Sequence, residues 1–136
     1  MIPTKEENCI EIQNLVKKFD NKIVLNNINL NIKKGSITAL IGADGAGKTT
    51  LLRLIVGLLC NFEGKITTLD LNPAKNKTNI VSKTGYMPQR FGLYEDLTVI
   101  ENLNLYSELK GADKNFDKLL EFTTLKPFKN RLAGKL

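Results

Sequence analysis

The chain has 136 residues, of which 42% are hydrophobic and 25% are charged, and its formal net charge is +6. These values fit one globular domain with a modest core and exclude a chain that is disordered throughout. The sequence has no histidine and two distant cysteines, Cys9 and Cys60. A disulfide framework and a histidine-based metal or acid–base site are therefore excluded.

The charge pattern and the apolar runs limit the possible partners. The lysines are scattered and do not alternate with aromatic residues, so a solvated basic surface is favoured over a nucleic-acid or anionic membrane surface. The start of the chain, "MIPTKEENC", has no apolar signal segment, and the run "LLRLIVGLLC" is interrupted by Arg53 and too short to span a bilayer. We expect a cytoplasmic protein that reaches a membrane only through a partner.

Alternating apolar and polar residues predict strands over 9–19 and 22–32, joined by the turn "DNK" into an antiparallel hairpin. The apolar segment 36–43, "SITALIGA", predicts a strand that is buried on both faces and therefore parallel to its neighbours. It leads into a glycine-rich loop and then a helix over 47–59. The apolar positions of this helix surround it almost completely, which predicts a central helix.

The second half of the chain predicts mainly helices. Segment 63–72 predicts a strand pair or hairpin arm, 73–84 a loop with a short helical piece, and 84–89 a short strand. Apolar residues at helical spacing predict a helix over 97–111, ended by Gly111, and another over 113–125. The order of elements predicts an α/β domain with an antiparallel appendage.

The stretch "GADGAGKTT" satisfies the pattern G-x-x-x-x-G-K-[ST] between an apolar strand and a helix, and this pattern predicts a phosphate-binding loop. Its glycines let successive N–H groups point inward at the positive end of a helix. Lys48 is expected to reach the β- and γ-phosphates, Thr49 to ligate Mg²⁺, and Thr50 to support the α-phosphate side. The predicted cofactor-binding residues of the loop are Gly42, Ala43, Asp44, Gly45, Ala46, Gly47, Lys48, Thr49 and Thr50.

Two motifs in order, "IGADGAGKTTLLRLIVGLL" and "GYMPQRFGLYEDLTVIENL", resemble the ATP-binding domain of ABC transporters, and more narrowly the ATP-binding subunits of ABC-2-type multidrug exporters. The resemblance covers nearly the whole chain. It implies a P-loop NTPase core, a parallel sheet flanked by helices, with an N-terminal antiparallel β-subdomain. It also implies a division into a β-subdomain and core (10–72), a Q-loop region (73–97) and the start of a helical subdomain (98–136).

The resemblance assigns two further cofactor-binding residues. Phe19 matches the aromatic residue that stacks on adenine; a phenylalanine taken alone is more often a core residue, but the motif spacing favours the stacking role. Gln89 matches the Q-loop glutamine, whose amide oxygen approaches Mg²⁺ and the attacking water. Segment 90–99 matches the surface that docks onto a membrane subunit. Phe91, Leu93 and Tyr94 would form that apolar patch or pack into the domain's own core.

Several parts of a hydrolytic site are missing from the sequence. No apolar strand ends in Asp-Glu, there is no signature loop of the LSGGQ type, and the switch histidine has no counterpart. Asp44 stands where many family members carry asparagine or serine, and its charge would repel the γ-phosphate. We expect a truncated domain, of marginal stability, that holds MgATP without hydrolysing it, the alternative being a small independent P-loop protein.

The leading functional hypothesis is therefore the MgATP-binding part of an ABC-type exporter ATPase. The family resemblance implies a membrane-spanning subunit and a second, head-to-tail ATP-binding domain as partners, with a location at the inner face of the cell membrane. Two alternatives are a soluble ABC-type ATPase acting on nucleic acid or ribosomes, and a vestigial nucleotide-binding module.

Overall fold

The computed structural model describes residues 7–89 and 92–136, which divide into two compact units, Met1–Tyr86 and Met87–Leu136. The first unit contains β1 (Asn8–Phe19), β2 (Lys22–Lys33), α1 (Lys48–Ile55), β3 (Glu63–Thr68) and α2 (Lys77–Lys83). The second contains α3 (Val99–Lys110), α4 (Asp117–Phe122) and two short 3-10 turns, η1 (Lys126–Phe128) and η2 (Ala133–Lys135).

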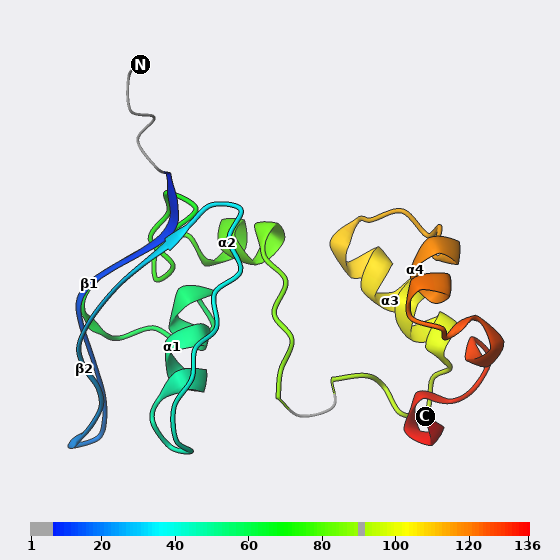
Figure 1. Cartoon of the computed structure of the whole chain (residues 1–136), viewed down its shortest axis with the longest axis horizontal. Coiled ribbons are helices and arrows are strands. Elements are labelled where there is room, and N and C mark those ends of the chain that lie inside the picture. Colours follow the sequence, from blue (N-terminus) through cyan, green and yellow to red (C-terminus); the bar gives the residue numbers. More distant parts are fainter. Residues whose placement is uncertain (1–6, 90–91) are drawn as a thin grey trace. The chain divides into compact units, whose positions relative to one another are not determined.

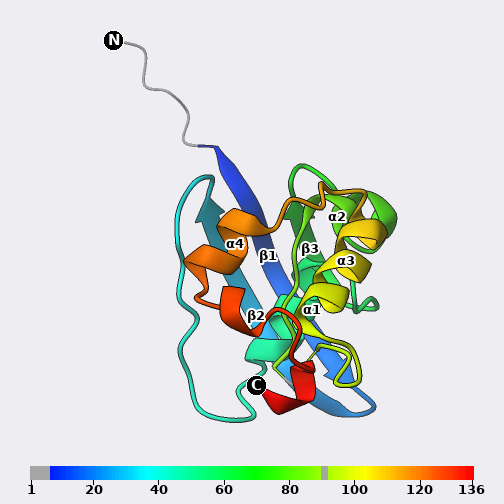
Figure 2. The same cartoon turned by 90° about the vertical axis from the view of Figure 1, so that its right-hand side faces the viewer.

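The sheet of the first unit has the strand order β2-β1-β3, and both neighbouring pairs are antiparallel. Figure 2 shows β1 between its two partners. The predicted hairpin of β1 and β2 is confirmed, and it turns at Asp20, whose φ of 50° is a conformation that aspartate tolerates better than most residues. The alternation in β2 also holds toward its end, since Ile28, Leu30 and Ile32 are half-buried while Asn29 and Asn31 are exposed.

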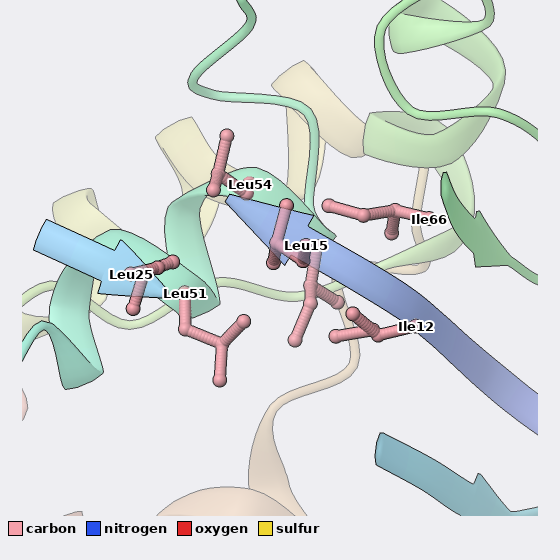
Figure 3. Close-up of a cluster of buried hydrophobic side chains, with 7 residues drawn as sticks. Ile12, Leu15, Leu25, Leu51, Leu54 and Ile66 are labelled. Carbon is pink, nitrogen blue, oxygen red and sulfur yellow. The ribbon is translucent and has the colours of Figure 1, made fainter. Parts of the chain in front are cut away.

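One face of this sheet packs on α1 and forms the core of the unit (Figure 3). The core side chains come from all three strands and from one side of the helix: Ile12, Leu15, Leu25, Leu51, Leu54, Ile55 and Ile66. The hydroxyl of Thr68 donates to the Ile55 carbonyl at 2.8 Å and so satisfies one of the free carbonyls at the end of α1.

The prediction of a helix that is apolar and buried all round is wrong for this structure. α1 ends at Ile55, and Leu52 on its outer side is exposed, as is Leu58 beyond its end. The helix therefore has one face against the sheet, where Leu51, Leu54 and Ile55 join the core cluster, and one face open.

The predicted strands over 36–43 and 84–89 are also wrong here, because both segments are irregular. Ile37 and Ile41 in the first segment, and Met87 in the second, are almost fully exposed. A strand of a parallel sheet takes its hydrogen bonds from neighbours, and in the part of the chain that the structure describes neither segment pairs with a strand. The described sheet is wholly antiparallel as a result.

In the second unit, α3 confirms the helix predicted over 97–111, and Gly111 ends it in the left-handed conformation. Its start is fixed by a capping box. The Thr98 side chain accepts a bond from the Glu101 N–H, and the Glu101 carboxylate accepts from the Thr98 N–H at 2.8 Å. The Thr98 hydroxyl also donates to the Glu101 carboxylate at 2.7 Å, and this bond, followed by the one from the Thr98 N–H, lowers the pKa of Glu101.

The apolar stripe predicted for α3 is only partly buried. Val99 is buried, but Tyr106 and Leu109 are exposed, and the most buried residue of the helix is the polar Asn102. Its amide donates to the carbonyls of Tyr94 and Thr98, both at 3.0 Å, and accepts from the Tyr94 N–H at 2.9 Å. Asn102 therefore organises the turn before α3. The helix predicted over 113–125 is present as the shorter α4.

Candidate nucleotide-binding site

The glycine-rich loop lies directly before α1, as the motif predicts. Figures 1 and 2 show that it turns at the same end of the first unit as the hairpin of β1 and β2. Gly45 and Gly47 adopt φ values of 78° and 88°, a left-handed conformation that residues with a Cβ resist. At Gly47 a Cβ would also lie 2.8 Å from Leu25 Cδ2 and 3.0 Å from the Val24 carbonyl oxygen. The end of the loop therefore rests against β2.

The first turn of α1 presents backbone donors at the end of the loop. Gly47 is the N-cap and offers no side-chain acceptor, and the first intrahelical bond runs from the Leu51 N–H to the Gly47 carbonyl at 2.9 Å. The N–H groups of Lys48, Thr49 and Thr50 precede that bond, so the helix itself gives them no acceptor. Donors at the positive end of a helix favour an anion. Both threonines are half-buried.

The Lys48 side chain folds back over the loop. Its ammonium donates to the carbonyls of Gly42 at 2.6 Å and Ala43 at 2.7 Å. A second loop contact, from the Ala46 N–H to the Ala43 carbonyl at 3.2 Å, tightens the turn around Asp44 and Gly45. Two backbone oxygens thus hold the positive charge at the loop, and a phosphate oxygen is a stronger acceptor for it.

Phe19 lies at the end of β1, close in the sheet to the strand that touches Gly47. It pairs with Lys22, while Lys17 pairs with Leu25, the residue that a Gly47 side chain would strike. Phe19 is 42% exposed, so the interpretation of this residue as part of the core is wrong. The Lys17 ammonium lies 4.7 Å from the centre of the ring. An exposed aromatic ring at the same end of the unit as the glycine loop offers a surface on which a flat base can stack.

Comparisons with known proteins give the context of this geometry. The sequence profile of the ABC transporter family matches residues 25–136. The chain belongs to the ABC transporter ATP-binding family. One curated relative is the probable multidrug ABC transporter ATP-binding protein YbhF of Escherichia coli (strain K12). It is 47% identical to this chain over 134 residues, an alignment that covers 93% of this chain and 23% of YbhF. The zinc import ATP-binding protein ZnuC of Rickettsia conorii is 37% identical over 96% of this chain and 52% of ZnuC.

Solved structures show the same ABC fold. An ATP-binding subunit of an ABC transporter matches with a TM-score of 0.81 at 25% identity, over 94% of this chain and 55% of that one. A dimeric ATP-binding cassette in a post-hydrolysis state, bound to ADP and Pi, matches with a TM-score of 0.76 at 27% identity, over 93% of this chain and 62% of that one. The ABC chain therefore spans between 23% and 62% of the length of these relatives.

The remaining predicted residues lie in the second unit of the ABC chain. Gln89 is exposed and irregular, and its role as a ligand of Mg²⁺ stays a prediction. Phe91, predicted to belong to a docking patch, lies outside the described residues. Leu93 and Tyr94 of the same patch are exposed, which agrees with a surface position. No helix in residues 7–89 and 92–136 is long and apolar enough to cross a membrane.

Sequence reasoning missed two features of this ABC site. The first is Lys17, whose placement beside Phe19 was signalled by their i, i+2 spacing on one strand face. The second is the approach of Gly47 to β2, which had no local signal because Leu25 is 22 positions away. Within the residues that the structure describes, no group of three histidine, cysteine or acidic side chains is placed to hold a metal ion. A cation here would depend on hydroxyl, amide and phosphate oxygens.

Proposed function

We propose that this chain is the MgATP-binding part of an ABC-type exporter ATPase subunit. The observation that carries the proposal is the glycine loop at the start of α1, where backbone donors without a helical acceptor and the Lys48 ammonium belong to the same short segment. The preference for export follows from the higher identity to a probable multidrug transporter protein, 47%, than to a zinc import protein, 37%.

Each residue of the loop has a separate task in this proposal. The N–H groups of Lys48, Thr49 and Thr50 bind phosphate oxygens, and Gly45 and Gly47 permit the backbone conformation that exposes them. The Lys48 ammonium leaves the Gly42 and Ala43 carbonyls and moves to the β- and γ-phosphates. The Thr49 hydroxyl and the Gln89 amide oxygen suit Mg²⁺, which prefers oxygen ligands. A bound Mg²⁺ ion would supply positive charge that offsets the charge of the phosphates.

The base is held at the other end of the site. Phe19 stacks on adenine with its exposed ring, and this contact gives the loop a preference for a nucleotide over a bare phosphate chain. Asp44, at the exposed tip of the loop, adds a negative charge that weakens the binding of a polyphosphate.

Hydrolysis needs groups that this sequence does not supply. Phosphoryl transfer requires a residue that orients the attacking water and a second hold on the metal ion. The sequence has no histidine, and no apolar run is followed by Asp-Glu, since the acidic pair in "GLYED" has the opposite order. We propose that the chain binds MgATP, and that turnover requires these groups from another segment or subunit.

The same proposal sets the partners. A second ATP-binding domain would close head to tail over the loop, and a dimeric cassette among the related structures supports such an arrangement. A membrane-spanning subunit would dock on the Q-loop region, which places this chain at the inner face of the membrane. Division into a core (10–72), a Q-loop region (73–97) and a helical part (98–136) belongs to this proposal.

The test is calorimetric titration of the purified chain with MgATP, together with a phosphate-release assay. Lys48→Ala removes charge-assisted bonds to phosphate and should weaken ATP binding by about 10- to 100-fold. Lys65→Ala is the matched control, because Lys65 is an exposed lysine on β3 of the same unit. Equal affinities of the two variants would overturn the assignment of the loop. Steady phosphate release that depends on Lys48 would overturn the claim that turnover needs further groups.

A second assay separates the exporter hypothesis from a soluble ABC-type ATPase. If the chain serves a transporter, it should be recovered together with a membrane-spanning protein from detergent extracts. Recovery with ribosomes or nucleic acid instead would favour the other class.

A further inference from the structure

The buried ammonium of Lys17 has no role among the phosphate and base contacts of the proposed site. Lys17 lies in β1, is only 6% exposed, and donates from its ammonium to the carbonyls of Cys60 at 3.0 Å and Asn61 at 2.8 Å. Both acceptors belong to the segment between α1 and β3. A charge is seldom buried unless it is hydrogen-bonded, and these two bonds fix the position of the ammonium.

The third neighbour of this ammonium is the Phe19 ring, 4.7 Å away from it at the centroid. Residues two apart on a strand point to the same side, so Lys17 and Phe19 share one face of β1. A cation within about 6 Å of a ring centre is attracted to the face of the ring. The ammonium therefore holds one face of the Phe19 ring, while the residue as a whole stays exposed.

We propose that Lys17 is a positioning residue for the nucleotide base: it holds Phe19 from behind, so that the outer face of the ring is ready to stack on a purine. This inference rests on the proposed function, because it assigns Phe19 the stacking role. Two physical effects support it. A ring already held in place loses less freedom on binding. A cation on one face also draws π density away from the other face, which favours stacking against an electron-rich base.

The experiment measures the affinity of the whole chain for two probes, MgATP and magnesium tripolyphosphate. Tripolyphosphate has the phosphates without the base, so it reports on the loop alone. Lys17→Met keeps the length of the side chain and removes the charge, and Lys18→Met is the matched control. Lys18 is the next residue along β1, and its ammonium pairs with Glu63 at 3.0 Å.

Lys17→Met should weaken MgATP binding by about fivefold, as expected for one cation–π contact, and leave tripolyphosphate binding unchanged. Lys18→Met should change neither affinity. Phe19→Leu should weaken MgATP binding, and adding Lys17→Met to it should have little further effect, because the lysine acts through the ring.

Two results would overturn the inference. An unchanged affinity of Lys17→Met for MgATP would show that the lysine does not act on the base. An equal loss of both probes would show that Lys17 only supports the fold, whether through local damage or through unfolding. Failure of the proposed function is distinct, because the unaltered chain would then bind MgATP no better than Lys48→Ala does.

Discussion

Gly47→Ala should destabilise the first unit more than any other glycine substitution in the loop. The new Cβ would lie 2.8 Å from Leu25 Cδ2 and 3.0 Å from the Val24 carbonyl oxygen, and the φ of 88° is itself unfavourable for alanine. The left-handed backbone costs about 1–2 kcal/mol, and overpacking against the buried Leu25 adds about 1–3 kcal/mol. The sum is about 2–5 kcal/mol, a large share of the stability of a small domain.

Two neighbouring glycines separate these contributions. Gly45 has a φ of 78°, but a Cβ added there would have no atom within 4 Å. Gly45→Ala should therefore lower the free energy of unfolding only by the backbone cost of about 1–2 kcal/mol. Gly42→Ala has ordinary contacts, the nearest being 3.6 Å from the Ala46 Cβ, and should lie within about 0.5 kcal/mol of the unaltered chain. The expected order of stability is therefore Gly42→Ala, then Gly45→Ala, then Gly47→Ala.

The assay is urea unfolding combined with hydrogen–deuterium exchange of peptides from β1 and β2, since these strands report on the contact at Leu25. MgATP affinity is measured on the same samples, and Gly47→Ala should lose it because the displaced loop misaligns the N–H groups of α1. If Gly47→Ala and Gly45→Ala proved equally stable, the close approach of the loop to β2 would not be the reason for glycine at position 47.

Three further outcomes are expected. Leu54→Ala should lower the free energy of unfolding in urea by about 2–5 kcal/mol, because Leu54 is fully buried in the core. Leu52→Ala, on the exposed side of α1, should lower it by less than about 1 kcal/mol. Equal losses would contradict the packing of α1 on the sheet. Because the folded-state pKa of Glu101 is lowered, its bonds with Thr98 stabilise α3 above the ordinary pKa of 4.5, and this stabilisation is lost as the pH falls through the folded-state pKa. The melting temperature followed by helical circular dichroism should therefore be lower in acid. The decrease should be smaller in Glu101→Gln. Ile41→Thr should leave the melting temperature unchanged and reduce the binding of a dye for exposed apolar surface, whereas a loss above about 1 kcal/mol would show that Ile41 is packed.

The features that the sequence predicted correctly are those with local causes. The hairpin of β1 and β2 follows from alternation and a short turn, and α3 ends at Gly111 because glycine accepts the left-handed conformation. The glycine loop is marked by the spacing of Gly42, Gly47 and Lys48. Each of these signals lies within a few residues of the structure that it specifies.

The predictions that failed depend on residues distant in sequence. Segment 36–43 has the composition of a central strand, but composition supplies no hydrogen-bonding neighbour, and the segment is irregular. The burial of Lys17 and its bonds to the Cys60 and Asn61 carbonyls, which the sequence did not predict, depend on how β1 meets a segment more than 40 positions away. Such pairings are set by tertiary packing, which a single sequence does not display.

In the glycine loop, the Gly42 and Ala43 carbonyls compete with a phosphate for the Lys48 ammonium. Its two bonds to the Gly42 and Ala43 carbonyls must be exchanged before it can bind a phosphate. The apparent dissociation constant is then the intrinsic one divided by the fraction of chains in which the ammonium is free of those carbonyls. Each kcal/mol held in these bonds weakens the affinity about fivefold. A substitution that loosens this contact while keeping the lysine would tighten binding without adding any new contact to the nucleotide.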